Sequence, residues 1–152
     1  MRSFMTPLLS ALVAVVLLAP AHSLSAQSEQ DREEIRRAAL DYIEGFYEGD
    51  STKLVRSIRP DVSKFGFHRQ DAANAYGSSP MSFQQMMDYA RRVRSDGRGA
   101  PDGAPKGVEI LDVLDQTAAV KVTAFWGTDY MHLAKYDGKW MIVHVLWQTP
   151  TT

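Results

Sequence analysis

The segment that most constrains the fold reads YMHLAKYDGKWMIVHVLW, residues 130–147, with Asp137 and Gly138 between two runs of alternating apolar residues. Both residues tolerate the positive backbone φ angles that a two-residue type I′ turn requires, so the flanking runs are predicted to pair as an antiparallel hairpin. Val, Ile, Thr and aromatic residues also dominate the chain just before this hairpin. The predicted strands of the resulting meander are residues 108–114, 117–125, 128–136 and 139–147.

Helical signals precede the strands. Residues 28–46 carry apolar side chains three and four positions apart, with acidic residues in the first turns that complement the helix dipole. Asp50 can cap a short helix that ends near Ser57. Ser82, followed three positions later by a glutamine, forms a capping box for a helix that runs to about Arg94. Helices first and a meander last predict an α+β fold, with helices packed on one face of an antiparallel sheet.

Two segments are predicted to be irregular. Residues 62–80 show no clear period. Residues 95–107 are rich in Gly and Pro, which favours a connector or a mobile flap over a pocket. The spacing of these glycines excludes a phosphate-binding P-loop.

The N-terminus has the order of a secretory signal peptide. Arg2 precedes an apolar run at residues 8–20, and small residues follow it. We predict cleavage after Ala26, with Ala21 as the alternative site. The run is short for a bilayer span, which takes roughly 20 apolar residues, so a retained anchor is the less favoured interpretation. The protein is therefore expected to be exported, to the periplasm or outside the cell.

Residues 27–152 are then predicted to form a single domain. They carry 16 basic and 18 acidic residues, a net charge of −2, which disfavours a nucleic-acid partner. After cleavage no membrane segment is expected. The chain has no cysteine, so its core must hold the fold together without disulfides.

Counting outward from two-residue turns at residues 126–127 and 137–138 predicts which side chains share a face of the sheet. The predicted pairs are Tyr136 with Lys139, Leu133 with Ile142, Met131 with both His144 and Val122, and Val120 with Leu133. The face predicted to meet the helices carries Val120, Val122, Ala124, Met131, Leu133, Trp140, Ile142, His144 and Leu146. A slip of one residue would reverse every such assignment.

His144 is the titratable member of this otherwise apolar face. Asp129 lies diagonally across from it in the predicted register, within reach of a hydrogen bond. A carboxylate that orients a histidine suits general acid–base catalysis near neutral pH. The alternative is a structural polar pair that joins two strands. His132 and His144 are predicted on opposite faces, so no metal site is expected.

Two sets of residues are predicted to contact other molecules. A mostly apolar ligand pocket, whose alternative is ordinary core, would be lined by Tyr42, Phe46, Phe83, Met86, Tyr89, Met131, Trp140 and His144. The opposite face of the sheet is too apolar to remain in water, which predicts a homodimer. Its interface would include Phe125, Tyr130, His132, Val143, Val145 and Trp147.

Three stretches, YIEGFYEGD, PMSFQQM and TDYMHLAKYDGKWMIVHVLW, are similar to the bacterial proteins called putative lumazine-binding proteins. These belong to the NTF2-like superfamily, which is also described as SnoaL-like or ketosteroid-isomerase-like. The resemblance covers residues 31–148 and implies a cone-shaped, cystatin-like α+β roll. It also implies a pocket between helices and sheet, often in a dimer.

Fold alone does not define a function, since this superfamily includes enzymes and proteins without chemistry. The favoured hypothesis is an exported protein that binds a small apolar or aromatic molecule without a cofactor. An isomerase or dehydratase that uses His144 and Asp129 is the first alternative. A dimeric interaction module with a filled core is the second.

Overall fold

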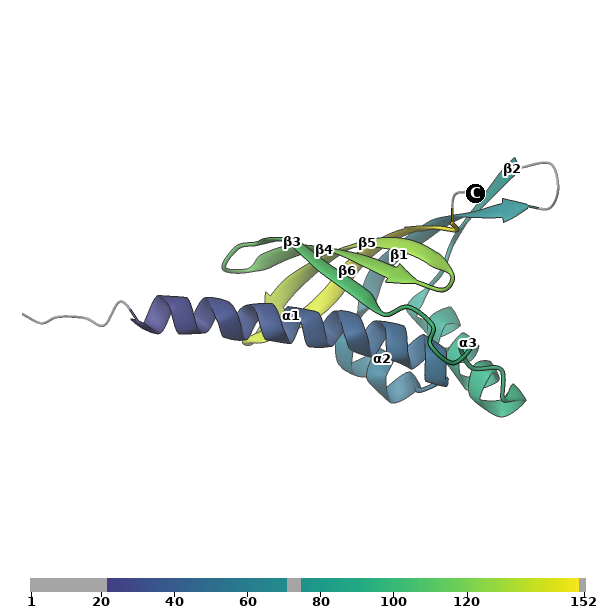
Figure 1. The fold of residues 1–152 in the computed structure, drawn as a ribbon, viewed down its shortest axis with the longest axis horizontal. Coiled ribbons are helices and arrows are strands. Elements are labelled where there is room, and N and C mark those ends of the chain that lie inside the picture. The colour runs from purple at the N-terminus through teal and green to yellow at the C-terminus, as the bar shows by residue number, and fades with distance from the viewer. Residues whose placement is uncertain (1–21, 71–74, 151–152) are drawn as a thin grey trace, which may run out of the picture.

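The computed structural model describes residues 22–70 and 75–150, which form three helices and six strands (Figure 1). The helices are α1 (His22–Glu48), α2 (Ser51–Ser57) and α3 (Phe83–Asp96). The strands are β1 (Ile58–Gln70), β2 (Ala75–Pro80), β3 (Gly107–Val113), β4 (Thr117–Ala124), β5 (Gly127–Tyr136) and β6 (Lys139–Gln148).

The predicted helices are confirmed, and local sequence explains where they begin and end. Helix α1 starts earlier than expected and ends before Gly49, whose φ of 67° is the left-handed conformation that terminates helices. The Asp50 carboxylate caps α2 by accepting a hydrogen bond from Thr52 N. Helix α3 begins with the predicted capping box between Ser82 and Gln85.

Most of the predicted leader lies outside the described residues, and its last residues, 22–26, belong to α1. Signal cleavage and export stay predictions. Within residues 22–70 and 75–150, no helix is long and apolar enough to cross a membrane.

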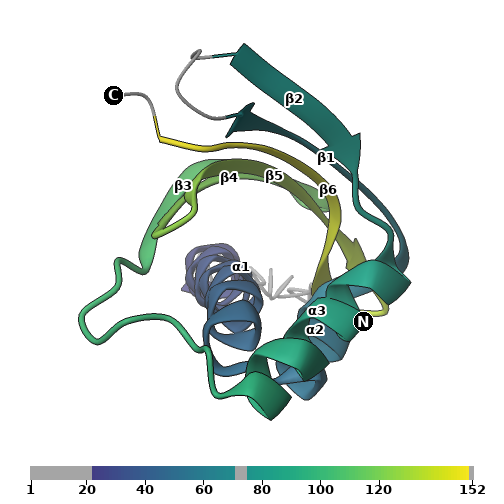
Figure 2. The same cartoon turned by 90° about the vertical axis from the view of Figure 1, so that its right-hand side faces the viewer.

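The six strands form one curved sheet in the order β2-β1-β6-β5-β4-β3. In Figure 2 the sheet arches over α1, while α2 and α3 lie side by side across the open side of the arch, next to β1 and β6. The α+β roll is thus confirmed. The sheet is mixed rather than wholly antiparallel, because β1 pairs parallel to β6.

The prediction of an irregular segment at residues 62–80 is wrong. Strands β1 and β2 occupy most of it and pair antiparallel, from Phe65 with Pro80 to Gln70 with Ala75. Gly66 and Gly77, which are typical turn residues, interrupt the alternation of side chains that indicates a strand. The four predicted C-terminal strands are confirmed as β3 to β6.

Of the two predicted turns, the one at residues 137–138 is confirmed and the one at residues 126–127 is displaced. Asp137 and Gly138 have φ angles of 48° and 78°, as a type I′ turn requires. In the β4–β5 hairpin Ala124 pairs with Gly127, so the turn lies one residue earlier than expected. The predicted pairings of Val120 and Val122 are therefore shifted by two residues. A shift of two leaves each side chain on its predicted face.

The β5–β6 register changes in the middle of β6. Leu133 pairs with Ile142 as predicted, but the next partners are His132 with His144. Val143 is the extra residue of a β-bulge, and a single extra residue reverses the faces of all that follow. The predicted pair of Met131 with His144 is wrong, because Met131 pairs with Val145.

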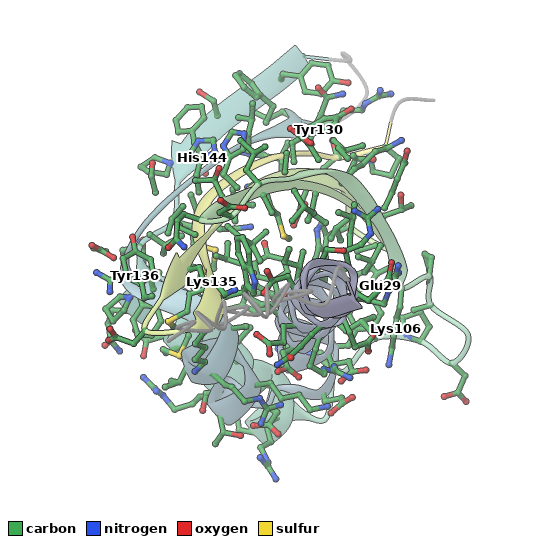
Figure 3. All side chains as sticks on the ribbon, turned by 90° about the vertical axis from the view of Figure 1, so that its left-hand side faces the viewer. Glu29, Lys106, Tyr130, Lys135, Tyr136 and His144 are labelled. Carbon is green, nitrogen blue, oxygen red and sulfur yellow. The ribbon has the colours of Figure 1, made fainter. Side chains whose placement is uncertain are left out.

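The bulge divides β6 between the two faces of the sheet. We call the concave face, which meets the helices, the inner face, and the convex one the outer face. Val145 is fully buried on the inner face, and Leu146, predicted there, is 40% exposed. Figure 3 shows His144 and Tyr130 on the convex side, away from α1. Val145 and Trp147 therefore leave the predicted dimer surface, and His144 joins it.

Asp31 fastens α1 to the far end of the sheet, although it is only 8% exposed. Its Oδ1 accepts hydrogen bonds from Lys135 Nζ at 2.5 Å and from Trp140 Nε1 at 3.0 Å. Burial raises the pKa of Asp31, but these two donors and the Lys135 charge outweigh it and hold the pKa below its usual 3.8.

We predict that Asp31→Asn lowers the free energy of unfolding at pH 7 by about 2–3 kcal/mol, because it leaves the Lys135 ammonium without its counter-charge. A lowered pKa gives stability that is present above pH 3.8 and lost as the pH falls through the folded-state pKa. The difference between variant and wild type should therefore shrink in acid. Urea unfolding at pH 7 and pH 3 measures both. Glu33→Gln, an exposed change on the same helix, is the control and should alter neither value.

Candidate functional site

A pocket of about 200 Å³ opens between the inner face, α1 and α3. Its lining is mostly aromatic, with a single charged side chain. The lining residues are Tyr42, Phe46, Lys64, Met81, Tyr89, Phe125, Trp126 and Trp147.

The aromatic wall is built from edge-to-face contacts around Trp126. Its ring centroid lies 5.7 Å from that of Phe46 and 6.1 Å from that of Tyr42. Tyr89 and Phe125 are 39% and 45% exposed, so they form the mouth. Tyr42 and Phe46, 0% and 7% exposed, form the deeper wall. The result is an apolar cleft with few polar groups, as small-molecule sites usually are.

Lys64 supplies the charge at the inner end of the pocket. It points inward from β1 beside Val145 of β6 and is 7% exposed. Its Nζ donates a hydrogen bond to the Tyr42 hydroxyl and lies 5.1 Å from the Tyr42 ring centroid and 5.5 Å from that of Trp147. Burial lowers the pKa of Lys64 to about 8, although the Asp129 carboxylate opposes this. The amine is therefore partly neutral at mildly alkaline pH.

Asp129 lies behind the pocket wall on β5 and is fully buried. Its Oδ1 accepts a hydrogen bond from Trp126 Nε1 at 2.9 Å. Its Oδ2 is buried without a hydrogen-bond partner among the described residues. Burial raises the pKa of Asp129, opposed first by the Lys64 charge and then by the hydrogen bond from Trp126.

Tyr42 connects the two ionisable groups. Burial and the Asp129 charge raise the pKa of its phenol well above the usual value, so the hydroxyl keeps its proton. Tyr42 accepts a hydrogen bond from Lys64, and the charge of the Asp129 carboxylate acts on its phenol. Lys64, Tyr42 and Asp129 thus form a buried cluster of interacting polar groups.

Because Gly66 has no side chain, the Trp147 indole can pack directly over it in the pocket wall. The two residues are neighbours in the β1–β6 pair. A Cβ added at Gly66 would lie 1.9 Å from Trp147 Nε1 and 2.1 Å from Trp147 Cε2. The indole therefore occupies the space that any other side chain would need.

Three of the eight predicted ligand-binding residues line the pocket, namely Tyr42, Phe46 and Tyr89. The others lie elsewhere because the pocket sits toward one end of α1. Met86, Met131 and Trp140 are buried in the core, and Phe83 is half-buried against it. His144 lies on the outer face, stacked on His132 with ring centroids 5.3 Å apart.

The predicted pair of Asp129 with His144 is wrong. Asp129 pairs across the strands with Trp147 and faces inward, whereas the bulge turns His144 outward. No hydrogen-bond partner for His144 Nδ1 is present among the described residues. The two residues therefore cannot form one acid–base unit.

Lys64 is the residue that sequence reasoning missed. It lies in the run VSKFGFHR, residues 62–69, where a strand was not predicted. The available signal was alternation, with Phe65 and Phe67 on one side and Val62, Lys64 and Gly66 on the other. This alternation indicates a strand, and it places Lys64 on the same face as Gly66 and opposite the two phenylalanines.

The loop at residues 97–106 is fastened to α1, and none of its residues lines the pocket. Ala100 N donates to Tyr47 O at 2.9 Å, and the Tyr47 hydroxyl donates to Pro105 O at 2.5 Å. The structure therefore places no flap from this loop over the pocket. Among residues 22–70 and 75–150, no cluster of three or more His, Asp or Glu side chains could hold a metal ion.

We predict that Gly66→Ala displaces the Trp147 indole and lowers the free energy of unfolding by about 1–3 kcal/mol, as overpacking does. The emission of Trp147 should also change as its ring moves. Gly107→Ala is the matched control, because its Cβ would come no closer than 3.2 Å to Thr123 Cβ. Equal stability of the two variants would contradict the close contact.

Comparison with known proteins agrees with this architecture. The sequence profile of the family described as "Putative lumazine-binding" matches residues 30–148. No protein with a curated description matches the chain.

Several solved structures share the fold. An NTF2-like protein of unknown function from Shewanella baltica OS155 is 22% identical with a TM-score of 0.62, and the match covers 82% of this chain and 97% of that one. An NTF2-like protein of unknown function from Silicibacter pomeroyi DSS-3 is 15% identical with a TM-score of 0.66, and the match covers 81% of this chain and 98% of that one. A structure named "Putative Scytalone Dehydratase" from Novosphingobium aromaticivorans DSM 12444 is 14% identical with a TM-score of 0.58, and the match covers 84% of this chain and 89% of that one.

At these identities the solved structures show the fold alone, and the profile match decides the family. The predicted resemblance is confirmed: the chain belongs to the putative lumazine-binding family and has the NTF2-like fold.

Proposed function

We propose that this protein binds a small aromatic molecule that carries an oxygen acceptor, such as a carboxylate or a carbonyl group. The observation that carries the proposal is the buried Lys64 ammonium in the wall of an otherwise aromatic pocket. Apolar walls favour the ring, and a single donor orients it.

The size of the pocket supports a ligand of about one substituted ring. An apolar cavity of about 150 Å³ in another protein is large enough to bind benzene. The pocket here measures about 200 Å³, which leaves room for a ring and a small polar substituent. A pocket of this size also disfavours the filled-core alternative.

Proton transfer to a ligand directly from Asp129 has weaker support. Its carboxyl group is fully buried and does not line the pocket. A general base must come within hydrogen-bond reach of the proton that it removes. Lys64 is the charged side chain among the described residues that line the pocket, so the isomerase or dehydratase alternative loses both of its predicted residues as direct participants.

We predict that the wild-type protein binds benzoate saturably at pH 7 and that Lys64→Met weakens this binding roughly 10- to 100-fold, the usual value of one charge-assisted hydrogen bond. Binding of toluene, which has no acceptor, should be nearly unchanged. Benzoate should also bind more weakly as the pH rises above about 8, where Lys64 loses its charge. Isothermal titration calorimetry measures all three effects.

Lys139→Met, at an exposed position of β6, is the matched control and should bind like the wild type. If neither benzoate nor toluene binds the wild-type protein saturably, the proposal is wrong. Native mass spectrometry of the purified protein would additionally detect a ligand that is already bound.

We further propose that the outer face packs against a second copy of the chain. Tyr130 and Leu146 are 52% and 40% exposed there, beside the stacked rings of His132 and His144. Phe125, predicted at this interface, lies instead at the mouth of the pocket. Large apolar side chains gathered on one face are typical of association surfaces. A second copy would present the same residues, as a two-fold interface requires.

Tyr130→Lys should shift a dimer toward the monomer, because it places a charge of the same sign on both sides of a two-fold interface. Sedimentation velocity over a range of concentrations measures this shift. Val55→Lys, at a position on α2 that is 55% exposed, is the control. A wild-type protein that sediments as a monomer at all concentrations would exclude the dimer.

A further inference from the structure

We propose that Lys64 is a nucleophilic amine that forms a reversible imine with small aromatic aldehydes or ketones bound in the pocket. This inference rests on the proposed function, since the carbonyl compound must first occupy the same pocket. It adds a covalent step and narrows the ligand to carbonyl compounds.

The placement of Lys64 Nζ carries the inference. The side chain is 7% exposed and still lines the pocket, so its amine meets a bound molecule rather than bulk water. Lys64 has no carboxylate within 4.0 Å among the described residues, unlike Lys53 and Lys135, which form ion pairs. A salt bridge would hold the lysine in its charged, unreactive form.

The surroundings favour the neutral amine. Aromatic rings of Tyr42, Phe46 and Trp147 surround Nζ with centroids 5.1–5.7 Å away, and burial lowers the pKa of Lys64 to about 8. Desolvation in an apolar pocket is a known way to activate a lysine toward carbonyl groups. Among the groups packed around it, Asp129 from β5 carries the opposing charge, and Tyr42 and Tyr89 are phenols.

Imine formation starts from the neutral amine. The Lys64 ammonium first loses a proton, which the Asp129 carboxylate, whose charge acts on Lys64, can hold. The neutral amine then forms a bond to the carbonyl carbon, and one of its two nitrogen protons moves to the carbonyl oxygen to give a carbinolamine.

The return of the proton that Lys64 first lost lets this hydroxyl group leave as water while the nitrogen lone pair forms the C=N bond. The nitrogen proton that remains makes the product an iminium ion. The net change is ammonium ion plus carbonyl compound giving iminium ion plus water. No oxidant or reductant is consumed, and hydrolysis reverses the step.

Reductive trapping tests the inference. The full chain is incubated with benzaldehyde and sodium cyanoborohydride, which reduces an imine to a stable benzylamine, and is then analysed by intact mass and peptide mapping. At pH 7.5 we expect a benzyl group on Lys64 to form at least about 10-fold faster than on the exposed Lys139, because surface lysines are almost fully protonated there. Peptide mapping separates this label from one on the α-amino group, whose ordinary pKa is also about 8. The labelling rate of Lys64 should level off above about pH 8.

Variants test whether fast labelling requires the Lys64 amine itself. Lys64→Met and Lys64→Arg should both lose the fast labelling, and Lys139→Met should keep it. Tyr42→Phe removes the hydroxyl that accepts from Lys64 Nζ and keeps the ring, so toluene should still bind and Lys64 should still be labelled faster than Lys139.

The outcomes distinguish this inference from the proposed function. If benzoate or toluene binds but Lys64 is labelled no faster than Lys139, the imine is excluded and the binding function stands. If nothing binds and nothing is labelled quickly, both fail. Peptide mapping of the wild-type protein decides the question even if a variant does not fold.

Discussion

The bulge at Val143 is the constraint on which the site depends. Before it, β6 directs Trp140 and Ile142 inward, and after it Val145 and Trp147 take that side. Strand β1 runs parallel to this second half, with Lys64 beside Val145 and Gly66 beside Trp147. Side chains of adjacent residues in neighbouring strands share a face. The bulge therefore places the Lys64 amine, and not the His144 imidazole, on the inner face of the sheet.

Burying that amine is unfavourable, and the surrounding residues offset only part of the cost. Removing an ammonium ion from water costs several kcal/mol even after relaxation. The hydrogen bond to Tyr42 and the faces of nearby rings contribute roughly 1–3 kcal/mol each. Asp129, itself destabilised by burial, adds the opposite charge at longer range. Strongly perturbed ionisable groups that gather around a cleft are more typical of functional sites than of cores.

Much of the fold could be predicted from the sequence because local signals agree with the tertiary structure. The capping box at Ser82, the cap at Asp50 and the turn at Asp137 each act within a few residues, and all three form as predicted. The displaced β4–β5 turn changed the predicted pairs but not the predicted faces, because a register shift of two residues leaves each side chain on the same face of the sheet. The bulge at Val143 has no comparable local signal, since neither Gly nor Pro marks it. Missing it reversed Val145 and Trp147 and placed His144 inside.

The candidate site was harder to predict because its polar members come from distant parts of the chain. Tyr42, Lys64 and Asp129 belong to α1, β1 and β5, and the parallel pairing of β1 with β6 joins residues about 80 positions apart. Periodicity within one segment cannot reveal such a pairing. Asp129 was expected to face inward and does so, but its partner could be named only after β1 was placed.

Lys64 and Asp129 can serve both proposed activities because the two groups are coupled electrostatically. With the proton on Lys64 and Asp129 ionised, the pocket presents a cation suited to a carboxylate. With the proton on Asp129 instead, the pocket presents a neutral amine suited to a carbonyl carbon. The net charge is the same in both states, so no ion must enter or leave the apolar interior. The opposite shifts of the two pKa values, lowered for Lys64 and raised for Asp129, both reduce the free-energy difference between these states. The ligand that enters would then determine which state the site adopts, because each chemical class interacts favourably with only one of them.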